Sequence, residues 1–170
     1  MSQARPIQAS TVRTYLNPVL DEDFPDPAVI RAPDGDYYAY ATQTLRDGNW
    51  INIQAARSPD LVHWEMIGDA MPEKPDWAHK TQDFWAPFVL HDGGRYLMFY
   101  SATHDACHDP HRGHCLAVAT SDSPEGPFTD MGMPLLMGVG FEYIDPMVFA
   151  DPASGRCFLY WGSGFQPIKV

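Results

Sequence analysis

The sequence is poor in basic residues and has no long apolar run, and each shortage excludes a class of protein. Lysine and arginine number 11 against 22 aspartates and glutamates in 170 residues, which gives a formal net charge of −11. Nucleic acids and anionic membrane surfaces bind basic patches, so we expect neither as a partner. No apolar run approaches the roughly 20 residues of a membrane-spanning helix.

Cysteine is also scarce, and the first residues lack the apolar stretch that a secretory signal requires. Cys107, Cys115 and Cys157 are an odd number without a framework spacing. Both features favour a reducing, cytoplasmic location, although a trimmed secreted chain would look the same. Hydrophobic residues make up 45% of the chain, which is typical of a globular domain with a sizeable core.

A Pro-led apolar segment occurs three times. Its copies are Asp-Pro-Ala-Val-Ile at 26–30, Ala-Pro-Phe-Val-Leu at 86–90 and Asp-Pro-Met-Val-Phe at 145–149. The prolines stand at 27, 87 and 146, so the period is 60 and then 59 residues. Because the middle copy has Ala where the others have Asp, the scaffold does not require the two aspartates.

The match extends beyond the proline, and it predicts an all-β fold. After each first strand come a Gly/Asp turn and an aromatic strand, then in the first two copies an Ala-rich strand and a short fourth strand, without a helical pattern. Four-stranded units of this length favour a β-propeller. A β-sandwich is the alternative, but it gives no reason for a whole unit to recur. The predicted units are blade 1 at about 24–68, blade 2 at about 84–131 and the start of blade 3 at about 143–170.

The repeat count predicts a partial propeller of about two and a half blades. The sequence has only two predicted strands of the third unit, whereas propellers close with at least about four blades. We therefore expect residues 17–170 to be the N-terminal half of a longer domain. Within the N-terminal segment 1–16, residues 11–16 could complete a last blade. The unpaired edge of the third blade predicts self-association.

Loop lengths predict which face of the propeller holds a site. The long loops all fall on the face where each first strand begins, and such loops on a rigid scaffold are where function is expected. Asp26 and Asp145 begin innermost strands there, so they should point into the axial cavity from different blades. Two carboxylates across a cavity suit acid/base chemistry. The alternative is that Asp-Pro only shapes a turn, but Ala86 shows that the turn can form without the carboxylate.

These blade openings resemble those of glycoside hydrolase family 43. The resemblance rests on Phe24-Pro25-Asp26-Pro27, Trp85-Ala86-Pro87 and Tyr143-Ile144-Asp145-Pro146, in that order and spacing. It extends from about Asn17 to the last residue and includes the turns at 58–64 and 123–128. It implies a five-bladed propeller that cleaves arabinose- or xylose-containing glycans with inversion of configuration. The expected partner is therefore an oligo- or polysaccharide.

The resemblance also implies roles for the aspartates. Asp26 would be the general base that activates water, and Asp145 would orient the general acid and raise its pKa. In the family that acid is a Glu of a later blade, which this chain does not contain. Glu125 precedes Gly-Pro but falls in a turn on the opposite face, and nothing marks Glu142 as the acid. The chain alone is expected to be inactive.

Further candidates are substrate-binding residues. Trp85 would form an apolar wall for a sugar ring, with inter-blade packing as the alternative, and Phe24 would flank the pocket. The loop 104–115 is rich in His, Cys and Asp, which suggests a transition metal, yet its spacing fits no structural zinc site. We favour a polar subsite that contains His104 and Asp105. No metal or cofactor is expected, although a complete propeller could hold a structural cation.

Two other functions stay open. A retaining fructan-active hydrolase has a related propeller with an Asp nucleophile. That group has Asn before the first Asp-Pro and Arg before the later one, where this chain has Pro25 and Ile144. A non-catalytic glycan-binding propeller could also keep both aspartates.

Overall fold

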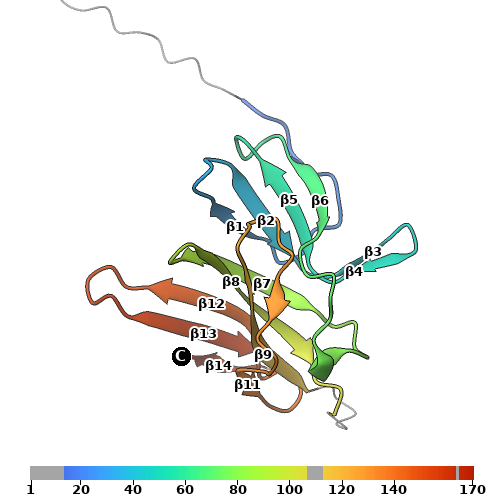
Figure 1. The fold of residues 1–170 in the computed structure, drawn as a ribbon, viewed down its shortest axis with the longest axis vertical. Helices are drawn as coiled ribbons and strands as arrows, with labels where there is room; N and C mark the ends of the chain where they lie inside the picture. The colour runs from blue at the N-terminus through green and yellow to red at the C-terminus, as the bar shows by residue number, and fades with distance from the viewer. Residues whose placement is uncertain (1–13, 107–112, 164) are drawn as a thin grey trace, which may run out of the picture.

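The regular secondary structure of the described residues is almost entirely antiparallel β-sheet (Figure 1). The computed structural model describes residues 14–106, 113–163 and 165–170. Over these ranges the helical structure is one 3-10 turn, η1 (Asp76–Ala78), and no helix there is long and apolar enough to cross a membrane. The predicted all-β class is confirmed.

The first sheet is blade 1, with the strand order β1-β2-β5-β6. Its strands are β1 (Ala28–Arg31), β2 (Tyr37–Ala41), β5 (Gln54–Ser58) and β6 (Glu65–Asp69). A separate hairpin of β3 (Thr44–Arg46) and β4 (Asn49–Ile51) extends from the loop between β2 and β5. It projects away from the sheets (Figure 1).

The second sheet is blade 2, with the order β10-β9-β8-β7, and β11 also pairs with β9. Its strands are β7 (Trp85–Asp92), β8 (Arg95–Thr103), β9 (His114–Ser121), β10 (Thr129–Asp130) and β11 (Leu136–Met137). The third sheet has the order β12-β13-β14 and contains β12 (Ile144–Ala150), β13 (Cys157–Ser163) and β14 (Gln166–Lys169). The innermost strands β1 and β12 both pack against β7.

The core lies mainly between blades 1 and 2. Alternating aromatic residues of β2 and β8 point into it, among them Tyr38, Tyr40 and Tyr100, all at most 2% exposed. Tyr40 meets Phe128 edge to face at 5.8 Å. The two blades therefore share one hydrophobic interior.

Apolar side chains on the two outer sheets remain open. Val29 of β1 is 48% exposed, Met147 of β12 is 46% exposed, and Ile168 of β14 is 73% exposed. These faces belong to the first and last sheets of the described part of the chain.

The structure differs from the sequence-based expectations in several elements. The third sheet has three strands rather than two, because β14 folds back on β13. Residues 44–51, expected as loop and strand start, form the β3–β4 hairpin, and the expected loop 132–145 contains β11. Residues 14–16 form no strand; the rest of the proposed closing strand lies outside the described residues.

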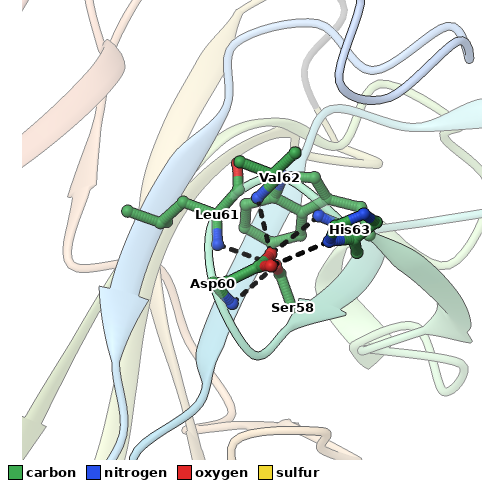
Figure 2. A network of polar contacts seen from close by, with 6 residues as sticks. Ser58, Asp60, Leu61, Val62 and His63 are labelled. Atoms are coloured by element: carbon green, nitrogen blue, oxygen red, sulfur yellow. Dashed lines mark hydrogen bonds and ion pairs between the residues drawn. The ribbon is translucent and has the colours of Figure 1, made fainter. Parts of the chain in front are cut away.

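The turn between β5 and β6 is fixed by one carboxylate (Figure 2). Asp60 Oδ1 accepts hydrogen bonds from the backbone N–H groups of Val62 at 2.9 Å and His63 at 2.8 Å. Its Oδ2 lies 2.7 Å from His63 Nδ1. Ser58 Oγ accepts the N–H of Leu61 at 2.9 Å. The Ser-Pro-Asp motif thus satisfies the polar groups of a tight turn.

Candidate active site

The three repeats share an unusual backbone conformation before their prolines. Asp26 has φ 54°, Ala86 has φ 44° and Asp145 has φ 55°. These values lie in the left-handed region, which is unfavourable for an alanine. Because Ala86 adopts it without a carboxylate, the scaffold itself imposes the conformation.

The strand pairing explains how this conformation is accommodated. The β7–β8 register shifts between Trp85 and Phe88, and the β12–β13 register shifts between Ile144 and Met147. Proline has no N–H to give to the ladder, so each X-Pro pair is left out of the regular pairing. Irregularities of this kind redirect side chains beside functional sites.

The three X-Pro pairs line one pocket between the innermost strands. It has a volume of about 250 Å³, and Asp26, Ala86 and Asp145 all line it. The other lining residues are Pro27, Ala28, Pro87, Phe88 and Pro146. Residues 119 positions apart in the sequence (26 and 145) thus meet at one site.

Asp145 has an unfavourable electrostatic environment. Desolvation by the surrounding walls raises the pKa of its carboxyl group above the ordinary Asp value, and the negative charge of Asp26 raises it further. As a whole residue Asp145 is nevertheless exposed. Two carboxylates whose charges interact across a small cavity can divide acid/base roles between them.

Asp26 is held by a residue that the sequence did not single out. Thr42 Oγ1 donates to Asp26 Oδ2 at 2.7 Å and accepts from the backbone N–H of Ala86 at 2.9 Å. Thr42 follows β2 directly, and no motif marks it. The β1–β2 pairing of blade 1 places it beside Asp26, and the approach of blade 2 adds its contact with Ala86.

Trp85 lies outside the lining of the axial pocket. Its ring is 4.2 Å from the His114 ring and 5.9 Å from the Phe141 ring, measured between centroids, and it is partly buried. Phe141 is 40% exposed. The three rings form a cluster at the start of β7, so the packing contacts of Trp85 are observed while its contact with sugar stays a prediction.

Phe24 lines a different hollow. Together with Val29 and Trp64 it borders an apolar groove of about 380 Å³. The groove includes the segment 17–20. The structure therefore does not bring Phe24 into the axial pocket.

His104 and Asp105 line a third, polar pocket of about 400 Å³ together with Lys80 and Thr103. Asp105 Oδ1 accepts the Lys80 N–H at 2.9 Å, and the His104 ring lies 5.8 Å from that of Trp77. Residues 107–112 of the His/Cys-rich loop are outside the described part. Within that part, no three His, Cys, Asp or Glu side chains are grouped so that they could hold a metal ion.

Neither Glu considered for the acid role lines the axial pocket. Glu125 lies 3.6 Å from Arg57 in an ion pair at the turn before β10, and the Glu142 N–H donates to Val139 O. Gly126, beside Glu125, has φ 87°, and a Cβ there would come within 2.6 Å of Ala70 O. Glu125 therefore belongs to a close contact between blades 1 and 2.

Comparison with known proteins identifies the family. Residues 15–168 match the model of glycosyl hydrolases family 43, and the chain belongs to this family. It is 29% identical over 160 residues to a xylan 1,3-beta-xylosidase of Vibrio sp., covering 88% of this chain and 27% of that protein. It is 28% identical over 178 residues to an extracellular endo-alpha-(1->5)-L-arabinanase of Thermotoga petrophila, covering 85% and 35%.

Solved structures show the same architecture. A thermostable family-43 glycoside hydrolase superposes with a TM-score of 0.69 at 32% identity, over 86% of this chain and 44% of that one. The endo-arabinase of Bacteroides thetaiotaomicron superposes with a TM-score of 0.66 at 26% identity, over 87% and 48%. The chain thus spans about a quarter to a half of the length of these relatives. The partial-propeller prediction is consistent with this coverage.

Proposed function

We propose that this chain supplies the general base and an orienting carboxylate of a glycosidase that cleaves arabinose- or xylose-containing glycans with inversion. One observation carries the proposal: Asp26 and Asp145, from repeats far apart in sequence, line one axial pocket whose third equivalent position is Ala86. Similarity to a xylosidase and an arabinanase supports the substrate class.

The chemistry needs only water and carboxyl groups. Asp26 takes a proton from a water molecule while the oxygen of that water bonds to the anomeric carbon. At the same time a general acid protonates the glycosidic oxygen, and the bond between that oxygen and the anomeric carbon breaks. Inversion requires base and acid roughly 6.5–9.5 Å apart to admit the water. The anionic form of Asp145 would disfavour ionisation of a nearby acid and keep it protonated.

The general acid would come from the rest of a complete propeller, and we therefore expect chain 1–170 to be inactive by itself. In such a propeller, further blades would cover the exposed apolar side chains of β1, β12 and β14. Val29, Met147 and Ile168 would then become part of blade-to-blade packing.

The test uses the protein with the complete propeller and arabinan, arabinoxylan and xylo-oligosaccharides as substrates. Asp26→Ala should lower kcat by about 10²–10⁴-fold, the usual contribution of a general base, without loss of folding by circular dichroism. NMR of the first product formed should show the inverted anomer.

Each other outcome has a defined meaning. Full activity of Asp26→Ala would overturn the assignment of the base. Retention of the anomeric configuration would instead support an Asp nucleophile of the fructan-hydrolase type. Glycan binding without turnover by the wild-type protein would support a non-catalytic propeller.

A further inference from the structure

We propose that Thr42 is a positioning residue for Asp26, and that the middle repeat acts in the site through its backbone rather than through a side chain. The inference rests on the proposed function, since it assumes that Asp26 is the base. It assigns a role to the Ala86 N–H group and to a threonine that lies outside every motif.

The direction of the hydrogen bonds is determined by chemistry. A backbone N–H can only donate, so Thr42 Oγ1 must be the acceptor in its 2.9 Å contact with Ala86 N. A hydroxyl group has a single proton, which is then directed at Asp26 Oδ2, 2.7 Å away. The two hydrogen bonds thus run in one direction, from the Ala86 N–H through the Thr42 hydroxyl to the Asp26 carboxylate. They end on a group that must be anionic to act as a base.

The bulge in β7 makes the first donor available. Because the β7–β8 register shifts between Trp85 and Phe88, Ala86 has no register partner in the ladder. Its N–H is directed across the blade boundary to Thr42 instead. In blades 1 and 3 the shared backbone conformation therefore places a carboxylate in the pocket. In blade 2 the same conformation directs the backbone N–H of Ala86 at blade 1.

Thr42 itself is held from three directions. Its N–H donates to Pro25 O at 3.1 Å, and its carbonyl oxygen accepts from Gln54 Nε2 at 2.8 Å. Gln54 is fully buried in β5. With both backbone groups and the hydroxyl bonded, Thr42 has little freedom to move, and a rigid support of this kind is what a catalytic group needs.

The arrangement leaves one oxygen of Asp26 for the reaction. Thr42 occupies Oδ2, and no residue in the described ranges bonds to Oδ1. Fixing one oxygen sets the orientation in which the other accepts the proton of water. Small displacements of a reacting group lower rates strongly, by about 10²-fold for 1 Å.

The experiment compares Thr42→Val with Thr42→Ser in the complete protein. Val keeps the branched shape without the hydroxyl, whereas Ser keeps the hydroxyl. Thr42→Val should lower kcat by about 10–10²-fold with little change in KM, because the bond positions the base and does not bind the substrate. Thr42→Ser should restore most of kcat. Crystal structures should show the Asp26 carboxylate displaced or in several orientations only in Thr42→Val.

Gln43→Met is the matched control for a purely structural effect. Gln43 Oε1 accepts the Phe84 N–H at 3.1 Å across the same blade boundary, without a contact to Asp26. This variant should lose thermal stability to a degree similar to Thr42→Val and keep its kcat. Equal losses of kcat in Gln43→Met and Thr42→Val would overturn the positioning role.

Asp26→Asn separates failure of the inference from failure of the proposed function. If Asp26→Asn is inactive but Thr42→Val has wild-type kcat and an unmoved Asp26, the positioning role is wrong and the base stands. If Asp26→Asn is fully active, the proposed function fails, and the crystal structures alone decide whether Thr42 orients this carboxylate.

Discussion

Asp60 and Asp145 are both open to solvent, yet their surroundings are opposite. Asp60 accepts two backbone N–H groups and meets the His63 ring, and these bonds, the backbone N–H of His63 foremost, hold its pKa well below the ordinary range. The Asp145 side chain makes no hydrogen bond to another described residue, and burial and the charge of Asp26 raise its pKa.

Asp60 is a carboxylate whose bonds stabilise the fold, whereas the ionised form of Asp145 is disfavoured by the fold around it. Asp60 stabilises a turn, and it belongs to the Ser-Pro-Asp motif of that turn. Asp145 has a strained backbone and a repelling neighbour, features that cluster at functional sites. Exposure alone would not distinguish the two residues; their partners do.

The largest effect expected from this contrast is on activity in the complete protein. Under the proposed function, Asp145→Asn should lower kcat by about 10²-fold, because the general acid would lose its orienting anion. Asp60→Asn should leave kcat nearly unchanged, since Asp60 lies in the turn between β5 and β6. Comparable losses in both variants would remove the distinction between the two carboxylates.

A smaller effect concerns the stability that Asp60 provides. Asp60→Asn should lower the free energy of unfolding at pH 7, because an amide oxygen replaces a charged acceptor of several bonds. A lowered pKa in the folded state stabilises the protein above the ordinary Asp value of about 3.9, and this contribution is lost as the pH falls below it. Urea unfolding should therefore show the largest gap between variant and wild type at neutral pH. A gap that widened in acid would contradict the expectation.

The smallest effect has the opposite sign. Because the pKa of Asp145 is raised in the folded state, its ionised form destabilises the fold, and Asp145→Asn should raise the melting temperature slightly at pH 7. The gain should vanish below about pH 3.9, where the wild-type carboxyl group is protonated in both the folded and the unfolded protein.

Asp26→Asn serves as the control: it should lower the pKa of Asp145 toward its ordinary value, which a carbon NMR titration can measure. An unchanged pKa would mean that the two charges do not interact.

The sequence was sufficient for the features that depend on local pattern. The X-Pro repeat predicted the innermost strands and the placement of Asp26 and Asp145 at one end of them. The β3–β4 hairpin was missed although Asp47-Gly48, with φ 51° and 80°, is a strong two-residue turn signal. Its short strands offered too few residues for an alternating pattern.

The features that depend on distances between blades were not predictable. The bond between Thr42 and Asp26 follows the β1–β2 pairing within blade 1, but the bond between Thr42 and Ala86 forms only where β7 approaches β2, and no periodicity encodes that approach. The same holds for Phe24, whose groove is formed by a segment that precedes blade 1. The raised pKa of Asp145 likewise depends on burial in the folded chain and, second, on the charge of Asp26, which comes from another blade.

The left-handed backbone at Ala86 has a consequence for how this site could evolve. A single base change converts an alanine codon into one for aspartate or glutamate, and the backbone at this position is already bent as it is at Asp26 and Asp145. A third acidic group could therefore appear in the axial pocket in one mutational step, without any rearrangement of the chain. In such a propeller, individual repeats can gain or lose a functional side chain at this position while the backbone stays the same.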